Sequence, residues 1–156
     1  MNKKVIIRDA NRKDALAIKN IQVQSIEQIN SKDYTPRQIR AVTKHRTVKR
    51  YKYLMKTDEK FFVATRANKI VGFCSIKKNE IVKLYVHPKE ISKGMGVKLL
   101  QYVERQTKSN RIKKLILKST ITAKYFYIKN GYKVIRKARH IRNGVSMLVI
   151  WMEKKL

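Results

Sequence analysis

The chain has 156 residues, enough for one compact domain with its own hydrophobic core and no need of disulfides or metals. Hydrophobic residues make up 43% of it and charged residues 31%, a balance that excludes a disordered tail. Because 39 Lys and Arg stand against 10 Asp and Glu, the formal net charge of +29 predicts attraction to polyanions, but it says little about fold.

Cysteine usage and hydropathy suggest where the protein works. The lone cysteine, Cys74, excludes an internal disulfide and fits best as a small apolar residue of a strand. The three histidines lie too far apart in sequence to form a metal motif with it, so no metal is expected. The longest apolar-dominated run, residues 145–152, is too short to cross a bilayer as a helix, and no signal-peptide pattern follows Met1. We therefore expect a cytoplasmic protein without a membrane partner.

The first third of the chain predicts one strand and two helices. Residues 5–8 are strand-like, and Asn11 can cap a helix in which apolar residues recur at helical spacing as far as Ile29. Pro36 follows a polar turn and suits the first turn of a second, unusually basic helix that runs to about Lys56.

The rest of the chain predicts a meander followed by alternating helices and strands. Apolar runs at 61–65, 70–76 and 81–86, separated by polar turns, indicate three antiparallel strands. A helix at about 97–108, a strand at 115–117 and a short helix at 122–130 ended by Gly131 follow. The last two strands, 132–135 and 146–152, form a hairpin around Asn143-Gly144. This order predicts an α/β fold with a central sheet and helices on its faces.

A turn with two glycines follows the strand that ends at Val86. Gly94 and Gly96 stand at the entry to a helix, and no Asp or Glu occurs from residue 91 through 103. Helix N-termini expose unpaired N–H groups and a partial positive charge, so phosphates can approach a glycine-lined entry, and Lys93 and Lys98 add to the field. The alternative is that the glycines only permit a tight strand-to-helix turn.

Residues 84–97 resemble the acyl-CoA-binding motif of the GNAT superfamily, in which a strand ending in leucine-aromatic-valine precedes R/Q-x-x-G-x-G/A. Ile91 departs from the motif, but the family's pyrophosphate contacts are largely backbone N–H groups, so the anion site remains. Residues 119–132 are similar to a second GNAT segment, Ala-x-x-Phe-Tyr-x-x-x-Gly-Phe/Tyr. The matching residues of this segment are Ala123, Phe126, Tyr127, Gly131 and Tyr132.

The resemblance covers nearly the whole chain and implies a single GNAT-like domain over residues 1–156. The implied fold is α/β, with a mixed, mostly antiparallel sheet of about seven strands flanked by about four helices. The implied activity is N-acetyl transfer from acetyl-CoA to a primary amine, directly within a ternary complex. The residues implied to bind acetyl-CoA are Leu84, Tyr85, Val86, Ile91, Ser92, Lys93, Gly94, Met95, Gly96 and Val97.

The same resemblance implies two catalytic residues. The family places a tyrosine at Tyr127 as general acid, because a phenol can protonate the coenzyme thiolate as it leaves. Its alternative role is that of a buried tyrosine with a satisfied hydroxyl. Glu80 matches a position where many members carry a glutamate that serves as general base, usually through water. Its alternative is an exposed partner of Lys77 or Lys83.

Basic residues gather in two segments that flank the acceptor groove in GNAT proteins. They are Arg37, Arg40, Lys44, Arg46, Lys49, Arg50, Lys52 and Lys56, and later Lys133, Arg136, Lys137, Arg139 and Arg142. Cationic acceptors such as polyamines should be repelled, so we favour an acceptor with an anionic body, such as a charged tRNA, a ribosome-associated chain or an acidic protein segment. The amine-bearing acceptor itself stays open between a small molecule, a protein and a charged tRNA. Two alternatives stay open: a solvated face without a partner, and a basic RNA- or ribosome-binding module on a GNAT fold with little or no catalysis. A homodimer also stays open.

Overall fold

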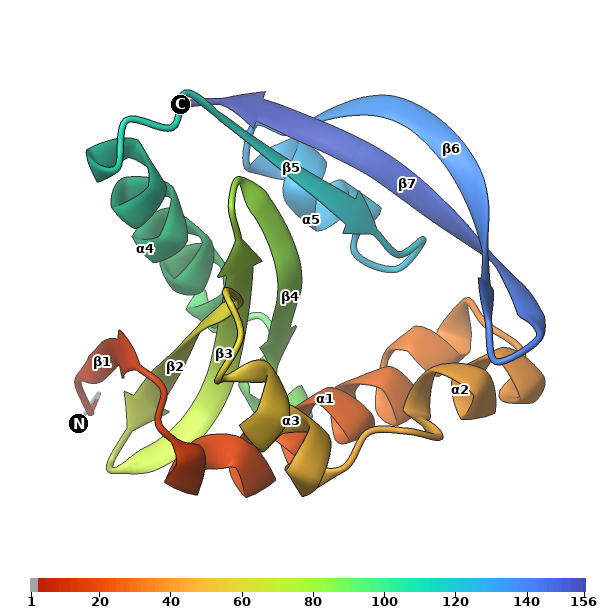
Figure 1. The fold of residues 1–156 in the computed structure, drawn as a ribbon, viewed down its shortest axis with the longest axis horizontal. Coiled ribbons are helices and arrows are strands. Elements are labelled where there is room, and N and C mark those ends of the chain that lie inside the picture. The colour runs from red at the N-terminus through yellow and green to blue at the C-terminus, as the bar shows by residue number, and fades with distance from the viewer. Residues whose placement is uncertain (1–2) are drawn as a thin grey trace.

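The computed structural model describes residues 3–156, which form one seven-stranded sheet in the order β1-β2-β3-β4-β5-β7-β6 (Figure 1). Within these residues β4 and β5 pair in parallel, and every other neighbouring pair is antiparallel. The strands are β1 (Val5–Asp9), β2 (Lys60–Arg66), β3 (Lys69–Lys77), β4 (Glu80–Val86), β5 (Lys114–Ser119), β6 (Lys133–Arg142) and β7 (Val145–Lys155). The predicted mixed, mostly antiparallel sheet is confirmed.

Helices cover both faces of this sheet. They are α1 (Ala15–Gln28), α2 (Pro36–Thr43), α3 (Val48–Leu54), α4 (Met95–Ser109) and α5 (Lys124–Lys129). α1 and α3 pack on one face, around Phe61 and Val63, and α4 packs on the other, around Phe62 and Ala64. Because β2 is buried on both faces, its sequence is a continuous apolar run instead of an alternating one.

The second predicted helix is broken in two, so residues 3–156 contain five α-helices where about four were expected. α2 ends at Thr43, whose hydroxyl donates back to the Ile39 carbonyl at 3.0 Å. Thr47 then takes an extended conformation, and its side chain accepts from the Arg50 N–H at 3.2 Å to cap α3. The continuous helix over 36–56 was therefore wrong, because this local cap competes with helix propagation.

Two other element boundaries also differ from the sequence prediction. α4 begins at Met95 instead of about Val97, and β6 extends to Arg142, well beyond residue 135. The hairpin turn lies where predicted, with positive φ at Asn143 (46°) and Gly144 (75°). In residues 3–156 no helix is long and apolar enough to span a membrane.

Candidate active site

β4 and β5 stay paired over only two positions. Glu80 lies opposite Ile116 and Ile81 opposite Leu117, and beyond them the strands separate, as Figure 1 shows. β3 still pairs with the other edge of β4 as far as Val86. One edge of residues 82–86 is therefore left without a strand partner in the described chain, and its backbone groups are available to a ligand.

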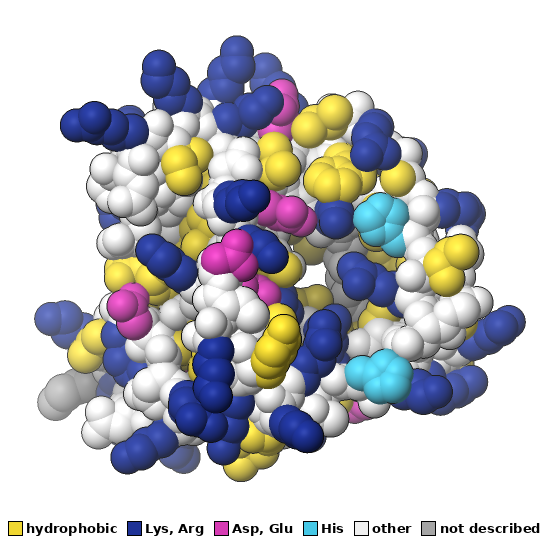
Figure 2. Space-filling view, in the orientation of Figure 1, with side chains coloured by type: hydrophobic (Ala, Val, Ile, Leu, Met, Phe, Trp, Pro, Cys, Tyr) yellow, Lys and Arg dark blue, Asp and Glu magenta, His cyan; other side chains and the backbone are white. Residues whose placement is uncertain are grey.

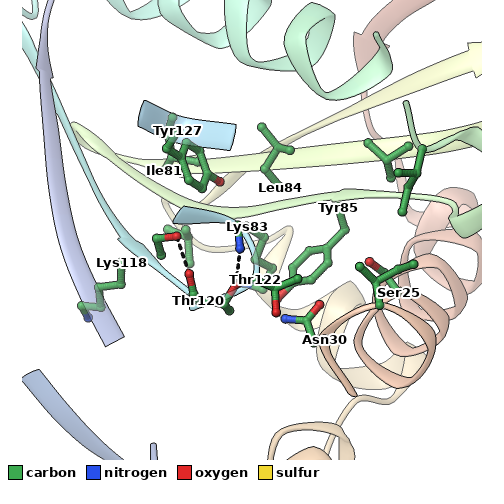
Figure 3. A pocket seen from close by; sticks show the side chains of 16 residues that line it. Ser25, Asn30, Ile81, Lys83, Leu84, Tyr85, Lys118, Thr120, Thr122 and Tyr127 are labelled. Atoms are coloured by element: carbon green, nitrogen blue, oxygen red, sulfur yellow. Dashed lines mark hydrogen bonds between the residues drawn. The ribbon is translucent and has the colours of Figure 1, made fainter. Parts of the chain in front are cut away.

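The first cavity lies in this separation and has a volume of about 190 Å³. Its walls come from β4, from the end of α1 with the residues that follow it, and from the segment between β5 and α5. Four residues expected to bind acetyl-CoA line it, Leu84, Tyr85, Val86 and Ile91, and Tyr127 lies at the opposite wall (Figure 3). We call it the donor cavity.

The glycine turn leaves the start of α4 open. Gly94 takes a left-handed conformation with φ 75°, and no side chain among the described residues caps the helix. Ser92 also has a positive φ, of 64°, which bends the chain sharply before the helix. The first N–H groups of a helix have no partner within it, so those at the start of α4 can meet an anion.

Gly96 is needed for a packing reason. A Cβ at this position would lie 3.2 Å from two carbons of the Phe126 ring, closer than an ordinary contact. Gly96 thus lets α4 approach α5 closely, and this contact holds the two motif segments together. Met95, also expected to bind acetyl-CoA, has a buried side chain: it is 1% exposed and packs in the same core cluster as Leu99. Only the backbone of Met95 can therefore contact a ligand.

Lys93 is partly neutralised by the same loop. Its ammonium lies 3.6 Å from the Glu90 carboxylate, which also pairs with Arg66. Since the Lys93 side chain is about half exposed, it remains able to move toward an approaching phosphate.

Tyr127 is 6% exposed, and its hydroxyl points toward the donor cavity in Figure 3. Its ring packs edge-on against Phe126 at 5.1 Å and Tyr132 at 5.6 Å. Burial raises the pKa of the Tyr127 phenol well above its usual value, and the neighbouring Cys74 and Tyr85 raise it further. The phenol therefore keeps its proton at neutral pH and can donate it, while its ring is held in one orientation.

Glu80 lies at the start of β4 and lines a second cavity, not the donor cavity. Its carboxylate is 3.8 Å from the Lys118 ammonium. The suggested partners of Glu80 are engaged elsewhere, because Lys77 pairs with Asp58 at 3.2 Å and Lys83 pairs with a different glutamate.

Sequence reasoning missed that glutamate. Glu59 is 6% exposed, and its Oε1 accepts from both Lys83 Nζ and Ser75 Oγ at 2.6 Å. Burial lowers the pKa of Lys83, while the Glu59 carboxylate opposes the shift. No motif surrounds Glu59, but a lysine between Val82 and Leu84 in an apolar strand was a signal that a buried partner existed.

The second cavity has a volume of about 390 Å³ and is lined by α1, α2, α3, β4 and the β6–β7 hairpin. We call it the acceptor cavity. Residues in the separation of β4 and β5 line both cavities: Asn30, Val82, Lys83, Tyr85, Lys118, Ser119 and Thr120. The two cavities therefore meet between the separated strands.

Most charged side chains on the face drawn in Figure 2 are Lys or Arg, and basic, acidic and apolar side chains all border the hollow at its centre. Arg37, Arg40 and Lys44 do not line the acceptor cavity but an open pocket that also contains Asn143 and Val145 at the hairpin turn. The predicted basic walls on the second helix and the last hairpin thus lie side by side, but only part of their charge reaches the acceptor cavity.

The chain belongs to the family of acetyltransferase (GNAT) domains, whose model matches residues 30–156. It is therefore an acetyltransferase of the class that uses acetyl-CoA as donor. Among curated proteins no relative matches it.

Solved structures carry the same fold. A GCN5-related N-acetyltransferase from Rhodopseudomonas palustris is 25% identical, with a TM-score of 0.89 over 100% of this chain and 98% of that one. The PaiA N-acetyltransferase from Thermoplasma acidophilum, solved with coenzyme A, is 22% identical, with a TM-score of 0.79 over 98% and 99% of the two chains. The yncA protein of Salmonella typhimurium, solved with its cofactor acetyl-CoA, is 17% identical, with a TM-score of 0.70 over 98% and 94%.

Proposed function

We propose that this chain, acting as one domain over residues 1–156, transfers the acetyl group of acetyl-CoA directly to a primary amine in a ternary complex. The observation that carries the proposal is the meeting of the two cavities at the separation of β4 and β5. Because an amine in one cavity and a thioester in the other meet there, transfer needs no covalent enzyme intermediate.

The backbone of residues 92–97 holds the coenzyme pyrophosphate in this proposal. The uncapped start of α4 and the absence of acids in its first turn support an anion there. The open edge of β4 at Leu84, Tyr85 and Val86 pairs with the amides of the pantetheine arm. The coenzyme A bound by the PaiA enzyme of Thermoplasma acidophilum is consistent with this assignment.

Two residues carry out the proton transfers of the proposed reaction: Glu80 acts on the acceptor amine and Tyr127 on the leaving sulfur. Glu80, through water, takes a proton from the acceptor ammonium so that the nitrogen lone pair can attack the thioester carbon. As the carbon–sulfur bond breaks, Tyr127 donates its phenolic proton to the leaving sulfur, and the second proton that the nitrogen loses as the amide forms restores the phenol through water. The position of the hydroxyl at the wall of the donor cavity supports this role. Because burial raises the pKa of the phenol, the group stays protonated until the leaving sulfur develops its charge, and it first stabilises that charge by a hydrogen bond.

Calorimetry with acetyl-CoA tests the donor site. We expect saturable binding in moderate salt, where nonspecific attraction to the basic surface is screened. Absence of such binding, together with tight and steeply salt-dependent RNA binding, would instead select the RNA-binding module.

Tyr127→Phe tests the acid. We expect kcat to fall by about 100-fold or more while the Kd for acetyl-CoA stays unchanged, because only the proton donor is lost. Tyr125→Phe is the matched control, since Tyr125 lies on the same helix but is 68% exposed. Equal kcat in Tyr127→Phe and the parent protein would remove Tyr127 from the mechanism.

A further inference from the structure

The acceptor cavity holds more positive charge than its own carboxylates neutralise. Two carboxylates line it, and each is already paired, Glu59 with Lys83 at 2.6 Å and Glu80 with Lys118 at 3.8 Å. The cavity also contains arginines that form no ion pair with any residue from 3 to 156. They are Arg46, Arg50 and Arg142.

Arg46 and Arg50 both line this cavity and lie close together in the chain. They stand four residues apart at the start of α3, on either side of its cap Thr47. Arg46 is half-buried, and its Nε donates to the Val42 carbonyl at 3.1 Å, which fixes the guanidinium but leaves its terminal nitrogens to other partners. A guanidinium held in this way can bind a carboxylate or phosphate through two parallel hydrogen bonds.

Both arginines line the acceptor cavity, Arg46 half-buried and Arg50 exposed, and their charges act on buried groups of its wall. Burial is the main cause of the lowered pKa of Lys83, and Arg46 and Arg50 both add to the lowering. Burial likewise raises the pKa of the Tyr51 phenol to about 12, and both arginines oppose that rise. Two cations therefore act on the wall around Lys83 and Tyr51; Glu59 in that wall is paired with Lys83, and neither arginine forms an ion pair with a residue from 3 to 156.

The rest of the cavity is suited to a small molecule with an apolar body. Its volume of about 390 Å³ lies in the range of small-ligand pockets, and its wall includes a set of apolar and aromatic side chains. They are Ile26, Tyr34, Ile39, Leu54, Tyr85 and Met147. Ser119 and Thr120 are among the residues that line both cavities, so a ligand in the acceptor cavity can place one end beside them and its other end elsewhere in the cavity.

We propose that the acceptor is a small primary amine that also carries a carboxylate or a phosphate, and that Arg46 and Arg50 bind this anionic group. Its apolar body lies against the aromatic and aliphatic wall, and its amine lies where the two cavities meet. This inference rests on the proposed acetyl transfer and names the substrate class. Polyamines have no group for the arginines, and the unpaired cations of the cavity repel them.

Acetyl transfer to matched pairs of amines tests the proposal. Each pair differs in the anionic group: phenylalanine and phenethylamine, leucine and isoamylamine, phosphoethanolamine and ethanolamine. We expect kcat/KM to be at least about 10-fold higher for the anionic member of the preferred pair, the value of one or more charge-assisted hydrogen bonds. Whether a carboxylate or a phosphate gives the larger ratio identifies the group.

Arg46→Gln and Arg50→Gln, singly and together, should remove this preference. We expect the double variant to lose about 10- to 100-fold in kcat/KM for the anionic amine, while the neutral amine changes little. Lys49→Gln with Lys52→Gln is the matched control, because it removes two charges from the same helix in a different pocket. If the control variant loses the same factor, the effect is one of net charge and the proposal is wrong.

Failure of the substrate class can be told apart from failure of the acetyl transfer. Saturable acetyl-CoA binding with equal kcat/KM for both members of every pair would overturn the anionic acceptor and leave the transferase intact. If no pair is acetylated, crystals of the coenzyme A complex soaked with phenyl phosphate decide the question. Phosphate density between Arg46 and Arg50 supports the proposal, and density elsewhere or none refutes it.

Discussion

Replacing Lys83 with Met would leave the Glu59 carboxylate buried without its counter-ion. The two side chains are 8% and 6% exposed, and their charged atoms are 2.6 Å apart. Ser75 would still donate to the carboxylate, but one hydroxyl does not replace an ammonium. Loss of one partner of a buried pair costs about 3–5 kcal/mol, a large part of the roughly 5–15 kcal/mol that stabilises a typical domain.

Urea unfolding followed by circular dichroism measures this cost. If the free energy of unfolding falls by about 2 kcal/mol per molar urea, the urea concentration at the midpoint of unfolding should be lower in Lys83→Met by about 1.5–2.5 M. Lys77→Met is the control, because Lys77 and Asp58 form an exposed pair, with side chains 52% and 58% exposed, and its loss should cost at most about 1 kcal/mol.

A second substitution tests the reason for the loss. Adding Glu59→Gln to Lys83→Met removes the stranded charge but keeps an acceptor for Ser75, so we expect the double variant to be more stable than Lys83→Met by about 2 kcal/mol or more. A double variant no more stable than Lys83→Met would refute the argument, because the loss would then come from packing and not from charge.

Two more predictions concern the turn at Gly94 and the turn that precedes α1. A Cβ added at Gly94 would meet no atom within 4 Å, but the backbone φ of 75° at this position strains any residue that has a Cβ. We therefore expect Gly94→Ala to lower the melting temperature, measured by calorimetry, by about 2–4 °C. Asp14 accepts two hydrogen bonds from Arg8, and these are the main cause of its pKa lying below the ordinary 3.8. Its ionised form therefore stabilises the fold above that pH, and this stability is lost as pH falls through the lowered pKa. Asp14→Asn should cost about 1–2 kcal/mol near pH 7 and much less near pH 3 in urea titrations, and a cost independent of pH would contradict this account.

Features encoded by neighbouring residues could be predicted from the sequence. Asn143-Gly144 specifies a hairpin because both residues tolerate positive φ. Asn11 is a cap, its side chain accepting from the Lys13 N–H at 2.9 Å, but it caps a 3-10 turn over Arg12–Asp14 that precedes α1 and not α1 itself. The break between α2 and α3 escaped prediction because Thr43 and Thr47 are also tolerated inside helices, and only their contacts decide between the two conformations.

Some residues of the candidate site could likewise be predicted from short stretches of sequence, and others could not. The glycine turn and the segment around Tyr127 are local patterns, so short stretches of sequence suffice to name their residues. The Glu59–Lys83 pair could not be predicted, because its members are separated by the turns of a meander and meet only through strand packing.

The sequence alone determined the family, the basic charge and, apart from the break between α2 and α3, the order of the elements, because each depends on short patterns or on composition. Tertiary structure decided that β4 and β5 separate after two paired positions and that two cavities meet there. It also brought Arg46 and Arg50 of one segment and Arg142 of another into a single cavity. The physical reason is that a cavity is formed by side chains distant in sequence, and their proximity depends on the packing of the whole sheet and its helices.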